Sequence, residues 1–472
     1  MRPADLAFRS IGELGALLRS GEVTSAGLTD YFLGRLETVG RPLNAVSAIM
    51  ADSARQEAAL ADAQLARGLD RGPLHGIPYG LKDIIAVPGA PTTWGAVPFS
   101  GQVLNYEAAV GERLRNAGAV LLGKLATVEL AGGMGYADPD ASLTGPALNP
   151  WDTRTWTGGS SSGPAAATAA GAVPFSIGSD TGGSIVMPAA WTGITGLRAT
   201  HGRVSRHGAM ALSWSFDRLG PMCRSAADCG LVLEAIAGHD PRDPSSLREP
   251  YRYRGRPARR DNFRIGVVTG SPDGVQDEVQ ANFESAVAIF RELGTVEEVE
   301  LPDFPYAEVA DIIMTAEIGA AFDEFLDAGR ASELTAAKAH AHRLAALALP
   351  ARDYLRAQRI RRHIFAALDD LARPFDALAA PMLGTVATPA DRSFAGLLSS
   401  SYPQLVNLAS VITGMPAISV PTGRGRDGLP TAVQLLGARL GENRLLDAAS
   451  ALEARTGWLG QRPPGFLDDE AA

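Results

Sequence analysis

Cysteine is scarce in this sequence, with only Cys223 and Cys229 among its 472 residues. That number excludes a disulfide framework and a four-thiolate zinc site, and we expect two reduced, partly buried thiols. Basic residues are not in excess either, because 43 Lys and Arg stand against 52 Asp and Glu, for a formal charge of −9. Nonspecific binding to nucleic acid requires a basic surface, so we expect no nucleic-acid partner.

Long apolar runs are also absent. No stretch reaches the length of about eighteen uncharged apolar residues that indicates a membrane-spanning helix. The N-terminal sequence MRPADLAFRSIGELGALL lacks the basic cap and unbroken apolar run of a signal peptide. With 46% hydrophobic and 20% charged residues, the composition is that of a soluble globular protein. We therefore expect a cytoplasmic protein without membrane contact.

Short apolar segments alternate with amphipathic segments along the chain. We expect strands at Gly76–Ile85 and Phe263–Val268, and helices at Ser25–Thr38, with Ser25 as its N-cap, and at Val275–Leu293. Strands that alternate with helices predict an α/β protein, in which helices cover both faces of a mixed sheet.

Residues 157–199 contain the most unusual sequence in the chain. Two glycine-rich loops, Gly158–Gly163 and Gly178–Ser184, flank the small and apolar segment Pro164–Ile177. The alanine-rich part of this segment suits a tightly packed helix, and Val173–Ile177 suits a short buried strand. Glycines let a backbone bend sharply and point N–H groups at a ligand. The pattern predicts the floor of an active site.

Three other motifs would indicate a different function, but each lacks a feature that the function requires. Gly159–Gly163 matches the G-x-S-x-G elbow of α/β-hydrolases, but that elbow follows a strand, whereas this segment follows a turn-like NPWD sequence. Gly118–Lys124 resembles a Walker A motif, yet Leu125 replaces the hydroxyl residue that would hold magnesium, so we reject ATP binding. His340 and His342, two residues apart, do not share a helical face. We expect neither a metal nor a cofactor.

Further motifs follow one another in a characteristic order. They are Leu74–Asp83, Gly158–Ser161, Gly178–Ser184, Pro188–Ala190, Gly193–Leu197, Gly202–Ser205, Asp217–Pro221 and Gly414–Pro421. Together they resemble the amidase signature family, whose blocks extend here from about residue 8 to residue 458. The resemblance implies the amidase signature fold, a large mixed sheet in a single domain over 1–472. Within it we expect a helical lead-in over 1–70, a catalytic core over 71–240 and a mainly helical covering segment over 300–375.

The resemblance also implies a mechanism based on a Ser-Ser-Lys triad. Ser184 would be the nucleophile that forms the acyl-enzyme, Ser160 the intermediate serine behind a cis peptide bond, and Lys82 the terminal base. A serine hydroxyl needs a base within hydrogen-bond reach. Lysine, with a pKa normally near 10.4, becomes such a base when burial favours its neutral form. Ser161 is the rival for the role of Ser160.

The same resemblance assigns roles around the triad. Four consecutive backbone N–H groups would form the oxyanion hole: Thr181, Gly182, Gly183 and Ser184. Three further residues would support the loops: Ser161, Ser179 and Asp180, the last as a structural group. Substrate contacts are expected from Met134, Gly135 and Trp214, and Phe216 is a further candidate for an apolar wall.

The chain departs from the family pattern at three positions. Val186 stands where the family usually has an arginine, so a supporting salt bridge or hydrogen bond is missing; Ser162 replaces a glycine, and Thr192 replaces a cysteine. None of these positions belongs to the triad, so they affect the subfamily assignment and leave the hydrolase assignment intact.

Three functions are compatible with these motifs. The first is a stand-alone amidohydrolase that cleaves C–N bonds other than peptide bonds in small amides, and related esters or carbamates such as urethanes. The second is the glutaminase (A) subunit of a tRNA-dependent amidotransferase. The third is a catalytically silent scaffold, but the presence of all three triad residues argues against it. Val186 and Trp214 depart from the amidotransferase pattern, so the sequence favours the first function. The oligomeric state, including a homodimer, stays open.

Overall fold

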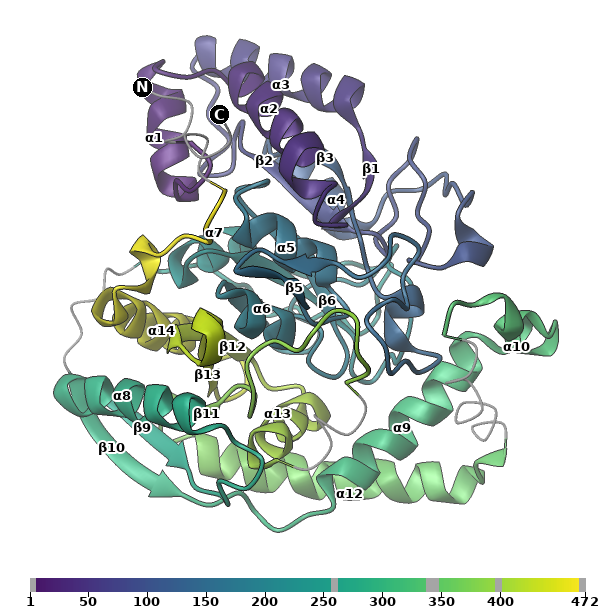
Figure 1. Cartoon of the computed structure of the whole chain (residues 1–472), viewed down its shortest axis with the longest axis vertical. Coiled ribbons are helices and arrows are strands. Elements are labelled where there is room, and N and C mark those ends of the chain that lie inside the picture. Colours follow the sequence, from purple (N-terminus) through teal and green to yellow (C-terminus); the bar gives the residue numbers. More distant parts are fainter. Residues whose placement is uncertain (1–5, 256–261, 337–347, 395–400, 467–472) are drawn as a thin grey trace.

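The computed structural model describes residues 6–255, 262–336, 348–394 and 401–466. In this part of the chain an 11-stranded sheet forms the centre of the molecule (Figure 1). From one edge to the other its strands are β1 (Val46–Ile49), β3 (Val120–Leu125), β2 (Pro78–Lys82), β6 (Ser176–Asp180), β8 (Arg218–Cys223), β7 (Thr195–Arg198), β12 (Ala417–Arg424), β13 (Pro430–Leu436), β11 (Ala377–Pro381), β9 (Phe263–Val268) and β10 (Gly294–Val299). A separate two-stranded sheet pairs β4 (Leu148–Asn149) with β5 (Asp152–Trp156).

Helices surround this sheet. They are α1 (Ile11–Ser20), α2 (Ser25–Arg35), α3 (Ala51–Ala66), α4 (Ala109–Asn116), α5 (Ser162–Ala169), α6 (Val186–Thr192), α7 (Ala226–Ile236), α8 (Asp277–Leu293), α9 (Tyr306–Ala321), α10 (Asp323–Asp327), α12 (Ala351–Ala372), α13 (Tyr402–Thr413) and α14 (Glu442–Thr456). Around β9, β10 and β11, helix α8 lies on one side and α12 on the other (Figure 1). The sheet is mixed, because β2 runs parallel to β3 and β6, whereas β6 runs antiparallel to β8. The predicted α/β fold is thus confirmed.

The ends of the first two helices follow from capping chemistry. Ser10 caps α1 and forms a capping box with Glu13, and Gly21 ends the helix with a left-handed φ of 75°. For α2 the cap is Thr24, whose side chain accepts the Gly27 N–H. The expectation of a Ser25 cap is therefore wrong by one residue, because the Ser25 hydroxyl instead donates to the Gly76 carbonyl in the core.

The segment between the two glycine-rich loops differs from the prediction in its boundaries. Helix α5 covers Ser162–Ala169, and strand β6 extends to Asp180, so it includes part of the predicted second loop. Glycine is needed within this strand, since a Cβ on Gly178 would lie 2.8 Å from Met222 Sδ and 2.9 Å from Ser161 Oγ. The strand therefore continues to the first residues of the site.

In the described part of the segment predicted to be mainly helical, 300–375, the structure has helices α9, α10 and α12. His340 and His342 lie outside the described residues. No helix in the described ranges combines the length and the apolar character needed to cross a membrane. The division into lead-in, core and covering segment stays a prediction.

Candidate active site

Lys82 lies at the end of β2, between strands β3 and β6, and its side chain has no solvent exposure. Its Nζ atom lies 2.7 Å from Ser160 Oγ and 2.8 Å from Ser179 Oγ. A neutral amine carries two protons and one lone pair, so it can donate to one hydroxyl and accept from the other. The buried lysine is thus in contact with two hydroxyl groups from two different segments of the chain.

Burial lowers the pKa of Lys82 from 10.5 to about 7. The carboxylates of Asp180 and Asp217 act in the opposite direction, because a nearby negative charge favours the ammonium form. The resulting pKa lies close to neutral pH, where a general base is most effective.

Ser160 is held in the first glycine-rich loop. The Gly159–Ser160 peptide bond is cis. The Ser160 carbonyl accepts hydrogen bonds from the Val128 N–H at 3.2 Å and from the Thr127 hydroxyl at 3.0 Å. These contacts fix the backbone and leave the side chain to face Lys82.

Ser161 makes different contacts. Its hydroxyl donates to the Ser179 carbonyl at 3.0 Å, and the Ser179 N–H lies 3.2 Å from the same oxygen. Its backbone N–H donates to the Ser184 carbonyl at 3.2 Å. Ser161 therefore joins the two glycine-rich loops, and the contact with Lys82 belongs to Ser160.

Ser184 lies between β6 and α6 and is half-buried. The turn that carries it is organised by Asp180, whose carboxylate accepts the Gly183 and Ile185 N–H groups, each at 2.8 Å. Gly183 has a φ of 129°, and a Cβ there would lie 2.5 Å from Met187 Sδ. The geometry of the turn thus requires glycine at position 183.

The four expected oxyanion-hole amides are not equivalent. The Gly183 N–H is bound to Asp180 Oδ1. In the described ranges, neither the Gly182 N–H nor the Ser184 N–H forms a hydrogen bond, and the Ser184 hydroxyl forms none either. These groups are available to a ligand.

Arg198 is a central residue of the site that sequence reasoning missed. Fully buried at the end of β7, it forms an ion pair with Asp180, with 3.0 Å between Nη1 and Oδ1. Burial alone would raise the pKa of Asp180, but Arg198, Arg218 and the Ile185 N–H outweigh it, so that this pKa is lowered. A single arginine in an otherwise uncharged segment, Thr195–Arg198, was the available signal in the sequence.

Asn407 of α13 extends this network and was also missed. Its side-chain oxygen accepts from Arg198 Nη1 at 3.0 Å, and its Nδ2 donates to the Gly182 carbonyl at 2.9 Å. One residue thus links the buried arginine to the turn that precedes Ser184. Nothing in the local sequence around position 407 indicates this contact, because it joins elements 225 residues apart.

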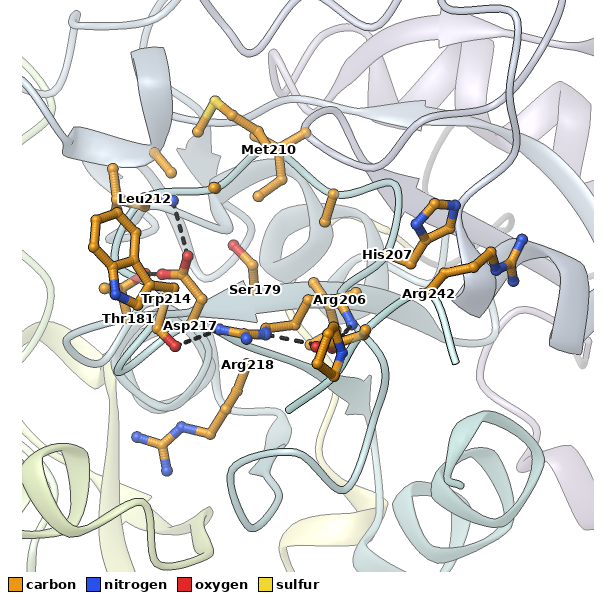
Figure 2. Close-up of a pocket in the computed structure, with 17 residues that line it drawn as sticks. Ser179, Thr181, Arg206, His207, Met210, Leu212, Trp214, Asp217, Arg218 and Arg242 are labelled. Carbon is orange, nitrogen blue, oxygen red and sulfur yellow. Dashed lines mark hydrogen bonds and ion pairs between the residues drawn. The ribbon is translucent and has the colours of Figure 1, made fainter. Parts of the chain in front are cut away.

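A cavity of about 200 Å³ lies next to Ser179 and Thr181 (Figure 2). Its lining includes Trp214, which is 44% exposed, together with Met210 and Leu212. Figure 2 shows Leu212, Trp214 and Asp217 on one side of the cavity, and His207 and Arg242 on the other. Leu212 and Trp214 thus form an apolar wall beside the Asp217 carboxylate, and this wall faces Arg242 and His207 across the cavity.

The other expected substrate contacts lie elsewhere. Met134 is buried in the hydrophobic core, Gly135 is half-buried, and Ala131 of the same segment lines the cavity. Phe216 is fully buried against α12, where the Arg361 guanidinium lies 5.0 Å from its ring. Phe216 is thus part of the core.

The three positions that depart from the family pattern do not contact Lys82. Val186 is fully buried at the start of α6, and Thr192 donates its hydroxyl to the Pro188 carbonyl at 2.7 Å. Ser162 begins α5. Both cysteines are free and buried.

Comparisons with known proteins identify the family. The family model described as Amidase matches residues 27–446. The A subunit of glutamyl-tRNA(Gln) amidotransferase from Chloroflexus aggregans is 36% identical, covering 97% of this chain and 99% of that protein. The structure of a peptide amidase from Stenotrophomonas maltophilia is 33% identical with a TM-score of 0.86, covering 98% of this chain and 100% of that one. The structure of the corresponding A subunit from Thermotoga maritima is 25% identical with a TM-score of 0.81, covering 98% and 99%.

These relatives overturn one expectation. The sequence predicted that no nucleic acid is involved, yet the curated relatives bear the name of an amidotransferase for glutamyl-tRNA(Gln). The prediction was wrong because a charge of −9 describes this chain alone and carries no information about RNA that other subunits of a complex contact.

The family match extends over most of the chain, and the relatives share its full length. Both kinds of relative, the amidotransferase subunits and the peptide amidase, are named for work on amide groups. The chain belongs to the amidase signature family and is an amidohydrolase that acts on carbon–nitrogen bonds.

Proposed function

We propose that the chain cleaves a carboxamide through an acyl-enzyme on Ser184, with Ser160 as proton relay and Lys82 as terminal base. The observation that supports this proposal most directly is the 2.7 Å distance between Lys82 Nζ and Ser160 Oγ at a fully buried lysine. Burial supplies a neutral amine at neutral pH, and the amine lies within reach of a hydroxyl.

The reaction begins with the transfer of two protons. Ser160 passes its proton to Lys82 Nζ and takes the proton of Ser184, whose Oγ attacks the amide carbon and forms a C–O bond. The protons then return along the same path to the amide nitrogen, the C–N bond breaks, and the amine leaves. Water attacks the ester in the second half-reaction, with Ser160 and Lys82 again moving the proton. Release of the carboxylic acid regenerates the Ser184 hydroxyl.

Backbone N–H groups stabilise the negative oxygen of the tetrahedral intermediate in this proposal. Of the four predicted donors, Gly183 is bound to Asp180, which leaves Thr181, Gly182 and Ser184 to face the substrate. Loss of one such donor typically costs about 3–4 kcal/mol of barrier stabilisation. The contacts of Asp180 and Asn407 support the loop in the shape that presents these donors.

For the substrate, we propose glutamine, with the chain acting as the glutaminase subunit of a tRNA-dependent amidotransferase. This was the second function considered from the sequence, and the curated relatives favour it over the first, since they are 35–37% identical along almost the entire chain. In this role the ammonia released at Ser184 passes to a partner subunit that amidates glutamyl-tRNA(Gln).

A stand-alone amidase is the second candidate, and two observations favour it. The peptide amidase is 33% identical and covers 98% of this chain. Trp214, which departs from the amidotransferase pattern, forms part of an apolar wall next to the site. Such a wall suits the apolar group of an amide, ester or carbamate better than the two charges of glutamine.

Ammonia and amine release from the purified chain distinguishes the two candidates. Glutamine and an aryl amide are offered to the chain alone and to the chain co-expressed with amidotransferase partner subunits, and Ser184→Ala is the control. Glutamine hydrolysis that needs the partners supports the glutaminase role, and aryl amide hydrolysis by the chain alone supports the second candidate. Turnover that Ser184→Ala leaves unchanged in both assays contradicts the proposed mechanism.

The acyl-enzyme itself is detectable by intact-protein mass spectrometry after rapid acid quench. We expect an adduct of the acyl group in the wild-type protein, located on the peptide that contains Ser184. Ser162→Ala is a matched control because Ser162, the first residue of α5, lies close to Ser160 in sequence and makes no hydrogen bond to Lys82. An adduct on any other serine contradicts the assignment of the nucleophile.

A further inference from the structure

Asp217 is a buried carboxylate to which the mechanism above gives no role. It lies directly before β8 and lines the cavity next to Thr181 (Figure 2). The Thr181 hydroxyl donates to its Oδ1 at 2.7 Å, and the Leu212 N–H donates to its Oδ2 at 2.8 Å. The Ser213 N–H lies 3.0 and 2.9 Å from the two oxygens. The Asp217 carboxylate thus connects two loops: Thr181–Ser184, which we call the oxyanion loop, and the loop that carries Trp214.

All of these contacts suit the ionised form of Asp217. Each partner donates a hydrogen, and a protonated carboxyl would place its own hydrogen against a donor. Burial raises the pKa of Asp217, and the hydrogen bonds from Leu212, Thr181 and Ser213 lower it in part. The charge of Asp180 favours the protonated form of Lys82, and the charge of Asp217 adds a smaller effect in the same direction.

The remaining charged groups in this region are mostly paired. Asp180 is bound to Arg198, although its charge still acts on the pKa of Lys82. On the neighbouring strand, Lys124 and Asp83 form their own ion pair at 3.1 Å. Arg206 and Arg218 are the arginines that act on Asp217, and Glu317 binds the same loop through Ser213. His201 lies near both arginines, and burial lowers its pKa to about 3, so it is neutral.

We propose that Asp217 is a positioning residue that joins the loop of Leu212–Trp214 to the loop of Thr181–Ser184, and that its negative charge helps Asp180 to maintain the basicity of Lys82. This inference rests on the proposed function of Lys82 as the base. Without such a charge, burial would make Lys82 a weaker base, less able to take the proton from Ser160. The Asp217 carboxylate thus holds the cavity wall that contains Trp214 against the loop of Thr181, which in the proposed mechanism binds the reacting carbonyl.

The substitution Asp217→Asn removes the negative charge of the side chain and keeps its shape. The asparagine oxygen can accept from Leu212 and Ser213, and its NH₂ group can donate to Thr181 once that hydroxyl rotates. We expect the acidic limb of the kcat/KM–pH profile to move to lower pH by about 0.5 unit or more, because the ammonium form loses a favourable charge. At pH values above the limb we expect kcat to fall, since the base is weaker.

Glu317→Gln is the matched control. Glu317 of α9 is also buried and binds the same loop, through the Ser213 hydroxyl at 2.6 Å and the Ser215 N–H at 2.9 Å. It contacts neither Thr181 nor Lys82. We expect Glu317→Gln to alter KM while leaving the acidic limb in place. An unmoved limb in Asp217→Asn, or an equal shift in both variants, overturns the inference.

Thr181→Val tests the link between the loops from its other end, including the case in which Asp217→Asn does not fold. It removes the hydroxyl that donates to Asp217 and keeps the shape of the side chain. We expect kcat to fall about tenfold with KM little changed, as for a lost hydrogen bond to a charged group, and Thr181→Ser to restore it. A Val variant with wild-type kcat contradicts the link.

The kcat/KM–pH profile of the wild-type protein distinguishes failure of this inference from failure of the proposed function. If activity requires Ser184 and shows an acidic limb that Lys82→Ala abolishes, the mechanism stands whatever Asp217→Asn does. If the wild-type protein shows no such limb, the role of Lys82 fails first, and the inference on Asp217 fails with it.

Discussion

Lys82 and Ser160 contact each other across 78 residues of sequence, with 2.7 Å between Nζ and Oγ. The contact exists because β2, which ends at Lys82, lies beside β6, and the loop of Ser160 is joined to β6 by Ser161. A flexible four-carbon side chain normally carries a hydrated charge to the surface. Here the sheet encloses the side chain, and burial lowers its pKa to about 7, as the proposed role of a base requires.

Removal of the amine should abolish most of the activity. We expect Lys82→Ala to reduce kcat/KM by between about 10² and 10⁴, the usual contribution of a positioned general base. Circular dichroism of the variant confirms that the sheet has formed. A variant within tenfold of the wild type would show that Lys82 is not the base.

The pH dependence of kcat/KM follows from the same group. Only neutral Lys82 accepts a proton, and burial lowers its pKa to about 7, so activity should rise with pH through this value. Below pH 7 we expect a loss of about tenfold per pH unit. The profile is measured with an aryl amide or glutamine between pH 5 and 9. Constant activity down to pH 5 is incompatible with this assignment.

The ion pair between Arg198 and Asp180 should contribute strongly to the stability of the folded chain. Arg198→Met leaves a buried carboxylate without its partner, which typically costs about 3–5 kcal/mol. We expect a clear drop in the unfolding temperature and loss of activity, because Asp180 also holds Gly183 and Ile185. Arg198→Lys keeps the charge and should be affected less. An unfolding temperature equal to that of the wild type would show that the pair contributes nothing.

The Lys82–Ser160 contact in the candidate site was predictable from the sequence because both residues lie in short contiguous motifs. Residues such as Lys82 and Ser160 stand within motifs whose glycines and serines occur at fixed spacing, and the structure places these two side chains in contact. Helix ends depend on local chemistry where a cap and its partner are close in sequence, as at Ser10 and Gly21.

The residues that sequence reasoning missed act through long-range contacts. Arg198 and Asn407 are 209 residues apart and meet only in the folded chain. Likewise, Phe216 looks like a pocket residue in the sequence, whereas Trp214, two positions away, is the one that lines the cavity. Which of two neighbouring aromatic residues faces the core depends on packing against α12, which the local pattern does not encode.

Trp214 should influence which substrate the site accepts. Trp214→Ala removes the largest apolar group of the cavity wall, so we expect KM for an aryl amide to rise about tenfold or more, from the loss of roughly 1.5–3 kcal/mol of buried apolar contact. The KM for glutamine should change much less, because its two charges gain little from an apolar wall. Leu355→Ala, at an exposed apolar position on α12, is the control. Equal effects on both substrates would exclude a role in selectivity.

The cost of burying Lys82 should be visible in the pH dependence of stability. The pKa is about 7 in the folded chain and 10.5 in a solvated lysine, so between these values the unfolded chain binds a proton that the folded chain lacks. Stability should therefore rise with pH across this window, and below pH 7 the full penalty is present, at about 1.4 kcal/mol per unit of lowered pKa. Lys82→Met should unfold at a higher temperature than the wild type at pH 6.5, with a difference that shrinks towards pH 10.

Lys124→Met is the matched control, because it leaves the buried Asp83 carboxylate without its ion-pair partner and should destabilise the protein at both pH values. A Lys82→Met variant less stable than the wild type at pH 6.5 would show that burial of the charged Lys82 does not carry the penalty that its lowered pKa requires.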